Sequence, residues 1–259
     1  MLFDTHAHLD DEKYDVDRDE VIKNIYDEGI SLLVNVGSDM ESSEKALELA
    51  KKYSFIYAAV GVHPYSAPHL TEEDICYLKE MTKDKKVVAI GEIGLDYHFE
   101  DTDRIGQKKG FIRQIELARE LDLPYIVHDR DSHQDCYDII KNSGYLRGVM
   151  HCFSGSSEFA KQMVDLGFYI SFAGTVTFKN AKKVHEAAKT VPLERLLIET
   201  DSPYLAPEPY RGKRNNPLNV IKTLEAIADI KGISIEKLAR ITMENGKTFF
   251  GINQKAGLL

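Results

Sequence analysis

The feature that most constrains this sequence is a repeated alternation of short apolar segments with longer amphipathic ones. Eight segments are rich in apolar and β-branched residues: MLFDTHAHL, SLLVNVG, FIYAAVGVHP, VVAIGEIGLDY, PYIVHDR, GVMHCFSG, FYISFAGTV and LLIETDSPYL. Their nearly continuous apolar character is typical of strands that are buried on both faces. Seven of them are followed by a polar loop and a stretch with helical spacing. Repeated strand and helix units of this kind predict an α/β fold with a parallel sheet.

Helices are expected between these strands and after the last one. The helical spacing covers residues 18–28, 42–52, 72–82, 104–121, 157–166, 180–190, 218–230 and 235–250. Thr71 is a plausible start for one of them, because its hydroxyl can cap the next turn and the acidic residues that follow meet the helix dipole. The sequence shows no linker, low-complexity run or internal repeat. We therefore predict one domain over residues 1–259.

The polar residues at the strand ends favour a closed barrel over an open sheet. Successive strand ends lie 22 to 36 residues apart, which is about the length of one βα unit. A closed barrel brings all eight strand ends to one face, whereas an open doubly wound sheet spreads them along a line. The glycine-rich phosphate loops of open sheets are also missing from the sequence. We predict a TIM-type (β/α)8 barrel with additional C-terminal helices.

Side chains that can bind metal collect at the predicted barrel mouth. His6 and His8 are two residues apart on the first strand, so alternation points both imidazoles to the same side. Alone, such a pair is also compatible with structural or surface histidines. Other strand ends carry five more titratable residues: His63, Glu92, His128, His151 and Asp201. Because buried carboxylates without partners are costly, a shared metal centre explains these residues better than separate hydrogen bonds would.

The number of donors predicts two cations. Four imidazoles and two carboxylates can fill two partial coordination shells if one carboxylate bridges them, which leaves positions for water or substrate. Glu92 is the expected bridge, because the fourth strand lies between the first and the fifth and sixth around the ring. The first predicted site consists of His6, His8, Glu92 and Asp201, and the second of Glu92, His128 and His151.

At this point the sequence resembles a known family. The ordered motifs DTHAHLD, GVHP, GEIGLDYH, the histidine of PYIVHDRD, MHCFSG and IETDSPYLAP resemble those of the TatD family of metal-dependent deoxyribonucleases, within the amidohydrolase-like barrels. They extend from Asp4 to Pro207, about four fifths of the chain. The resemblance implies a TIM-type barrel, metal-dependent hydrolysis of DNA phosphodiesters, and the same six metal ligands that the donor count gives.

Two details refine the resemblance. Neighbouring barrels similar to phosphotriesterase or dihydroorotase bridge their metals with a modified lysine on the fourth strand, whereas this strand carries Glu92 at the mouth. The basic loop departs from the family pattern, because many relatives continue as RGKRNEP and this chain has Asn216 in place of the glutamate. The departure leaves the metal ligands intact and makes the role of the loop from Arg211 to Asn216 uncertain.

A hydrolytic mechanism assigns roles to residues around the predicted centre. Asp201 is expected to accept the proton of the attacking water and to return it to the leaving alkoxide. His63 is expected to contact the phosphate or donate a proton, and Arg130 and the cluster that begins at Arg211 to bind flanking phosphates. Asp4 is expected to orient a ligand histidine or its strand.

Several other residues receive structural roles. Asp96 and His98 are expected to cap or line the fourth loop rather than bind metal. Cys152 is expected to point away from the mouth as a buried thiol, because it alternates with its neighbour His151. Three more histidines are expected at the surface: His69, His133 and His185.

The composition of the chain limits which partners it can bind and indicates its cellular compartment. With 33 Lys and Arg against 42 Asp and Glu, the formal charge is −9, which argues against a protein held on nucleic acid by bulk positive charge. Bound cations would change the local field, so phosphate chemistry stays open. The three cysteines lack a CxxC pair, and MLFDTHAHLD lacks the basic start and apolar stretch of a signal peptide. We expect a cytoplasmic monomer without membrane contact.

The leading hypothesis is therefore a metal-dependent nuclease that works on single-stranded DNA or on frayed ends. An ester or amide hydrolase of the same barrel superfamily, acting on a small or nucleotide-linked substrate, is a second possibility. A non-catalytic metal-binding scaffold is a third, although it would leave open coordination positions without a use. The residues do not fix the metal, and Mg²⁺, Zn²⁺ and Mn²⁺ all suit this donor set.

Overall fold

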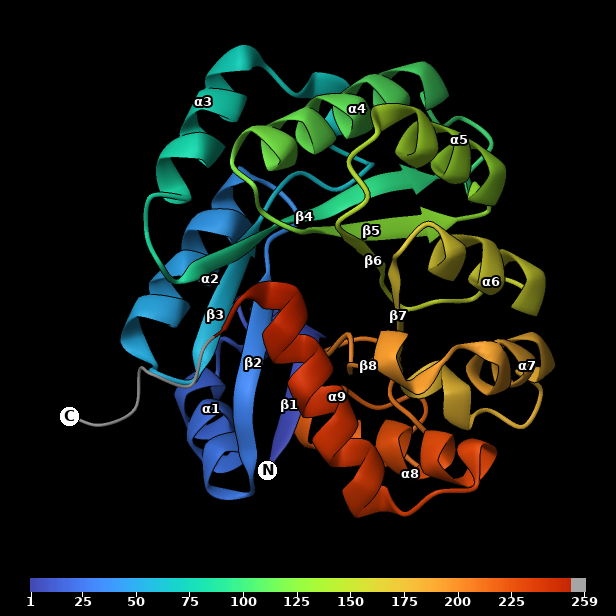
Figure 1. Cartoon of the computed structure of the whole chain (residues 1–259). Helices are drawn as coiled ribbons and strands as arrows, with labels where there is room; N and C mark the ends of the chain where they lie inside the picture. Colours follow the sequence, from blue (N-terminus) through green and yellow to red (C-terminus); the bar gives the residue numbers. More distant parts are fainter. Residues whose placement is uncertain (253–259) are drawn as a thin grey trace.

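Eight parallel strands form one sheet in chain order around a barrel (Figure 1). The computed structural model describes residues 1–252. The strands are β1 (Leu2–Ala7), β2 (Ile30–Val36), β3 (Ile56–Val60), β4 (Val87–Asp96), β5 (Tyr125–Arg130), β6 (Gly148–Met150), β7 (Tyr169–Phe172) and β8 (Leu196–Ile198). The N–H of His8 donates to the carbonyl of Ser202 (2.7 Å), and the N–H of Asp201 donates to the carbonyl of His6 (2.9 Å). These bonds close the sheet, so the predicted TIM-type barrel is confirmed and the open sheet is excluded.

Helices cover the outside of the barrel (Figure 1). They are α1 (Arg18–Asp27), α2 (Met40–Lys52), α3 (Glu72–Met81), α4 (Arg104–Glu120), α5 (His133–Ser143), α6 (Ser157–Asp165), α7 (Lys182–Thr190), α8 (Val220–Lys231) and α9 (Ile235–Phe250). Short 3-10 turns lie at Glu12–Tyr14, Ala67–His69, Gly174–Thr177, Leu193–Arg195 and Pro217–Asn219. The expected helices agree within about two residues at each end. Helix α5 was not among them, because it buries only Cys136 and Ile140 and so has a narrow apolar face.

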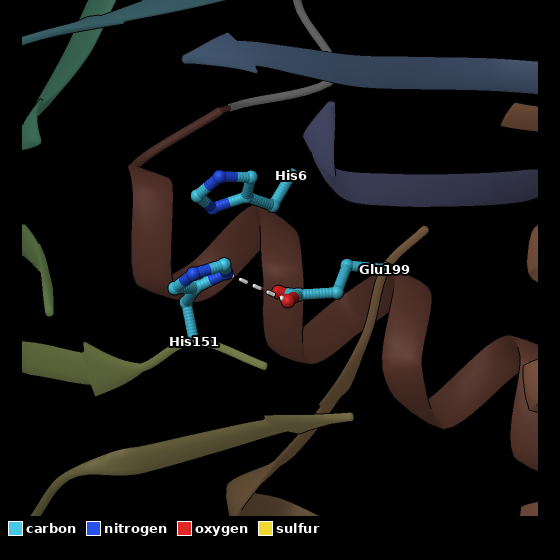
Figure 2. Close-up of side chains that lie close together, drawn as sticks. All are labelled: His6, His151 and Glu199. Carbon is cyan, nitrogen blue, oxygen red and sulfur yellow. Dashed lines mark hydrogen bonds and ion pairs between the residues drawn. The ribbon is translucent and has the colours of Figure 1, made fainter. Parts of the chain in front are cut away.

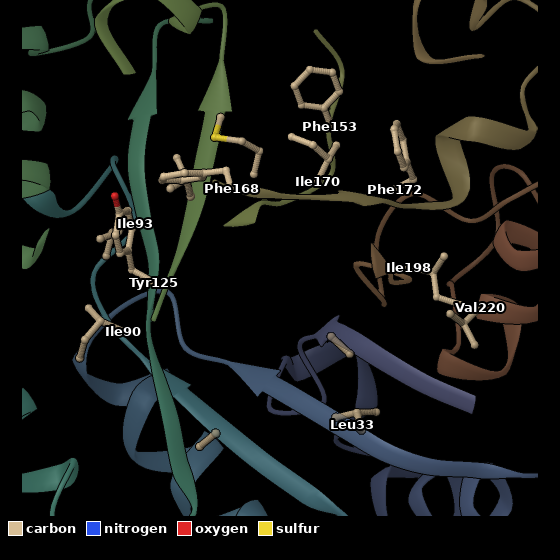
Figure 3. Packing of buried hydrophobic residues seen from close by; sticks show 14 of the residues in the cluster. Leu33, Ile90, Ile93, Tyr125, Phe153, Phe168, Ile170, Phe172, Ile198 and Val220 are labelled. Carbon is tan, nitrogen blue, oxygen red and sulfur yellow. The ribbon is translucent and has the colours of Figure 1, made fainter. Parts of the chain in front are cut away.

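Two hydrophobic cores hold the strand ends in place. The larger core lies between the sheet and the surrounding helices, where side chains such as Leu33, Tyr125 and Phe168 are fully buried (Figure 3). The smaller core joins strand residues to α9, and the ring of Phe250 lies 5.9 Å from that of Phe3 near the start of β1. Helix α9 therefore packs near the amino-terminal ends of the strands and leaves the carboxyl-terminal face open. Within residues 1–252, the helices lack the length and apolar character needed to span a bilayer.

Candidate metal centre

The residues of the candidate site lie on or just after the carboxyl-terminal ends of the strands. On β1, alternation places Asp4 and His6 on the same side, and His8 follows the strand end. Asp4 is buried, and its Oδ1 accepts hydrogen bonds from the N–H groups of His6 (3.3 Å) and Thr200 (2.9 Å). This carboxylate therefore ties the first strand to the segment that follows β8, and it holds the backbone that carries His6.

The carboxylate oxygens of Glu92 and Asp201 lie close to the ring nitrogens of both histidines of the first predicted site. Nε2 of His6 lies 3.2 Å from Nε2 of His8. Oε2 of Glu92 lies 3.4 Å from the His6 nitrogen and 3.8 Å from the His8 nitrogen, and Oδ1 of Asp201 lies 3.8 and 3.4 Å from the same two atoms. A tetrahedral zinc site with bonds of about 2.0 to 2.1 Å separates its donors by about 3.3 Å. These side chains therefore fit a divalent cation.

The second oxygen of Glu92 faces the other predicted site. Its Oε1 lies 2.6 Å from Nδ1 of His128 and 3.0 Å from Nε2 of His151. The side chain is nearly fully buried, and burial opposes its ionisation, but the surrounding imidazoles outweigh burial and hold the pKa of Glu92 well below its usual value. Glu92 is thus an ionised carboxylate whose two oxygens face two different pairs of histidines. This is the arrangement that a bridging ligand requires.

His63 and Asp96 adjoin the same cluster. The ring of His63 lies 4.4 Å from that of His128, and its ligand atoms group with those of Glu92 and His128 within 4.8 Å. Burial, together with the neighbouring His128, lowers the pKa of His63 to about 4, so its imidazole is neutral at pH 7. Asp96 is buried, and its Oδ2 lies 3.0 Å from Nε2 of His128. Asp96 also accepts a hydrogen bond from the N–H of His98 (3.0 Å) and lines the cavity, as expected, and its contact with His128 is an additional one. His98 is exposed and faces Asp131.

Glu199 is a buried residue of the site that sequence reasoning missed. Its Oε1 lies 2.9 Å from Nδ1 of His151 and accepts a hydrogen bond from the N–H of Cys152 (2.7 Å), as Figure 2 shows for the histidine. The ring of His6 stacks on His151 at 3.9 Å. Burial opposes protonation of His151, but the charges of Glu92 and Glu199 outweigh it and raise its pKa. The sequence does contain a signal for Glu199: it precedes Asp201 by two residues, the same spacing as that of His6 and His8.

A cavity of about 390 Å³ opens above the cluster. Its lining includes Arg130 and His63, in line with their expected contact with substrate. Arg211 lies outside the lining that the described residues form, and its guanidinium packs 4.5 Å from the centre of the Phe178 ring. The structure therefore brings together the six predicted metal ligands, His63 and Arg130, and leaves Arg211 at the side.

The basic loop after β8 has a structural role. Arg214 donates to Oδ1 of Asp17 at 2.8 Å and lies over the ring of Tyr14. The buried side-chain amide of Asn215 donates to the carbonyl groups of Thr200 (2.9 Å) and Tyr204 (2.7 Å). Asn216, where many relatives have glutamate, accepts from the N–H of Leu218 and begins a 3-10 turn. This part of the loop braces the segment that carries Asp201.

The remaining residues singled out in the sequence do not belong to the cavity lining formed by the described residues. Cys152 is partly buried and lies outside the cavity lining formed by the described residues; burial raises the pKa of its thiol. His69 is exposed, as expected. His133 and His185 are half-buried instead, because the first lies 2.7 Å from Asp129 and the second 2.8 Å from the Val176 carbonyl.

A closed (β/α)8 barrel with histidines and carboxylates gathered at the carboxyl ends of its strands defines a metal-dependent hydrolase. Residues 3–251 match the family model described as TatD related DNase, so the chain belongs to the TatD family. It is 49% identical over 255 residues to the uncharacterized metal-dependent hydrolase YabD of Bacillus subtilis (strain 168), covering 98% of this chain and 100% of that protein.

Two proteins of Escherichia coli K12 are also similar. The uncharacterized metal-dependent hydrolase YcfH is 38% identical over 260 residues, covering 98% of this chain and 97% of that protein. The crystal structure of YJJV, a TatD homolog, superposes with a TM-score of 0.92 at 29% identity, covering 97% of this chain and 98% of that one. These relatives agree with the metal-binding chemistry that the donor atoms indicate.

Replacing Glu199 by glutamine is expected to weaken metal binding by about 10- to 100-fold, because the carboxylate that orients His151 and makes it more basic is lost. Titration of the metal-stripped protein with Zn²⁺ in a calorimeter measures the effect. Glu194→Gln, an exposed glutamate just before β8, is the matched control. Superimposable binding curves for Glu199→Gln and the unaltered protein would contradict the role assigned to Glu199.

Proposed function

We propose that this protein is a deoxyribonuclease that removes nucleotides from single-stranded or frayed DNA ends with the help of two divalent cations. The observation that carries the proposal is the buried carboxylate of Glu92, whose two oxygens face two separate pairs of imidazoles. The family description, TatD related DNase, supports DNA as the substrate.

The first cation would be held by His6, His8, Glu92 and Asp201, and the second by Glu92, His128 and His151. When bound, two such cations lower the pKa of a water molecule and neutralise charge on a phosphodiester. Mg²⁺, Zn²⁺ and Mn²⁺ all suit these donors, and the imidazole-rich set favours the softer ions.

The side chains around the donors would handle the proton and the phosphate. Oδ1 of Asp201 faces His8 and leaves Oδ2 to accept a proton from the attacking water and to return it to the leaving oxygen. Burial opposes ionisation of Asp201, but His8 and the other imidazoles outweigh it and lower its pKa, so the base is ionised at neutral pH. The neutral His63 can hydrogen-bond a phosphoryl oxygen, and Arg130 can pair with a flanking phosphate.

The shape and charge of the cavity favour strand ends. A volume of about 390 Å³ suits a ligand of nucleotide size rather than a duplex. Arg130 is the one arginine or lysine in the lining formed by the described residues, while Asp10 and Asp11 also face the cavity. Binding through bulk positive charge is therefore weak, and the cations themselves must supply much of the attraction for phosphate. The contact of Arg211 with a flanking phosphate, the cytoplasmic location and the monomeric state stay predictions.

The proposal is tested with metal-loaded protein on single-stranded DNA labelled at the 3′ or the 5′ end. We expect stepwise shortening from one end, stopped by chelation and reduced roughly 100-fold or more in His128→Ala, because one donor of the second site is lost. His69→Ala, an exposed histidine, is the matched control.

Other outcomes of the same assay are equally informative. Hydrolysis of small esters or amides without cleavage of DNA would support the second hypothesis, a small-substrate hydrolase. Stoichiometric metal without hydrolysis of any substrate on a broad panel would overturn the proposed nuclease and favour a scaffold.

A further inference from the structure

Two exposed aromatic rings lie side by side at the edge of the cavity. Tyr65 follows β3 and lines the cavity, and Phe99 follows the end of β4. Their ring centres are 5.9 Å apart, and the two residues are 47% and 53% exposed. Large aromatic side chains that stay open beside a ligand cavity mark a contact surface, because their apolar faces gain from being covered.

This aromatic pair is continuous with the metal centre. The ring of Tyr65 lies 4.8 Å from that of His63, and His63 lies 4.4 Å from His128. A row of neighbouring rings therefore leads from the exposed Phe99 to a predicted metal ligand. A nucleic-acid strand whose phosphate lies at the metal centre can place the base of a following nucleotide on the rings of Tyr65 and Phe99.

The charges around the cavity give the direction in which a polyanion leaves it. Arg130 lies at the end of β5, where it pairs in register with Asp96 of β4, three residues before Phe99. On the β1 and β8 side, Asp10 and Asp11 line the cavity. The hydroxyl of Tyr204, which also lines the cavity, donates to Asp11 at 2.5 Å. Arg130 is the one arginine or lysine in the lining formed by the described residues, so a flanking phosphate finds a guanidinium partner on the β4 and β5 side, next to Phe99.

We propose that Tyr65 and Phe99 form a stacking platform for an unpaired base beyond the two nucleotides that flank the scissile phosphate, with Arg130 on the phosphate that leads to it. The proposal rests on the proposed nuclease function and deepens it. Only a base without a stacked neighbour offers a free face to an aromatic side chain, and such stacking tolerates any sequence. The platform would therefore select single strands and frayed ends over an intact duplex.

The test compares oligothymidylates of two and ten nucleotides with the metal-loaded protein. In the unaltered protein we expect kcat/KM to rise with length. In Phe99→Ala we expect kcat/KM on the ten-nucleotide strand to fall about tenfold, mostly through KM, so that the length dependence flattens. Phe99→Trp should restore it, because an indole also stacks. Tyr77→Ala, a 46% exposed tyrosine on α3, is the matched control and should behave as the unaltered protein does.

The outcomes distinguish a failure of the stacking platform from a failure of the proposed nuclease function. If the strands are cleaved and Phe99→Ala keeps the original KM and length dependence, the platform is wrong and the nuclease stands. If Phe99→Ala loses affinity for duplex DNA or for a protein ligand but not for single strands, the assigned occupant is wrong. If the unaltered protein cleaves none of the strands yet hydrolyses bis(p-nitrophenyl) phosphate, both proposals fail. Equal thermal unfolding of Phe99→Ala and Tyr77→Ala excludes a folding defect.

Discussion

Replacing Glu92 by glutamine is expected to lower kcat/KM roughly 10³-fold or more and to reduce the number of bound cations. The carboxylate supplies one oxygen to each pair of imidazoles, 3.4 Å from Nε2 of His6 and 2.6 Å from Nδ1 of His128. Glutamine keeps the size of the side chain but loses its charge and presents an amide nitrogen to one of the two sites. Activity on single-stranded DNA and metal content by elemental mass spectrometry together measure the loss.

The control for this change is Glu48→Gln, an exposed glutamate on α2 that does not belong to the cavity lining formed by the described residues. It should keep both the metal content and the activity of the unaltered protein. If Glu92→Gln still held two cations per chain and lost less than about twofold in kcat/KM, Glu92 would not be a bridging ligand. The proposal that two cations share the Glu92 carboxylate would then be wrong.

Asp201→Asn is expected to slow the chemical step strongly while most of the metal binding is retained. The asparagine keeps a carbonyl oxygen near His8 but cannot accept a proton, so kcat should fall about 10²- to 10⁴-fold while KM changes little. Because three donors of the first site remain, we expect metal content to fall less than in Glu92→Gln. Steady-state kinetics at saturating metal, with metal analysis of the same sample, measures both effects.

Asp27→Asn at the exposed end of α1 is the matched substitution for this experiment and should leave kcat unchanged. A fully metal-loaded Asp201→Asn protein with normal turnover would remove Asp201 from the proton-transfer role. Another group at the cavity, with the neutral His63 as the first candidate, would then have to be tested as the base.

The barrel and the six converging donors could be predicted because they depend on local rules. Strand periodicity sets which residues face inward, and a closed parallel barrel collects its strand ends on one face. The same alternation also places Asp96 on the side of Glu92, four residues away on β4, whereas Glu199 and Asp201 follow the end of β8. Asp96 was expected only to cap or line the fourth loop, and Glu199 was not predicted, because spacing along the chain does not show which histidine nitrogen a carboxylate contacts.

Other features depend on contacts that no local rule supplies. Arg211 and Arg214 share a basic loop, yet one packs on Phe178 and the other pairs with Asp17. These partners lie 161 residues apart in the sequence, and their proximity follows from how the loop crosses the finished barrel. A run of positive charge in a sequence predicts an exposed loop, but not which of its side chains remain available to substrate.

The seam between β1 and β8 makes the order of synthesis matter for this enzyme. His6 and His8 are synthesised well before Asp201, which lies 193 residues after His8. A nascent chain that stops before β8 has two open sheet edges and lacks Asp201, one of the predicted metal ligands. The predicted set of ligands is therefore complete only after β8 has been made and the first and last strands have joined.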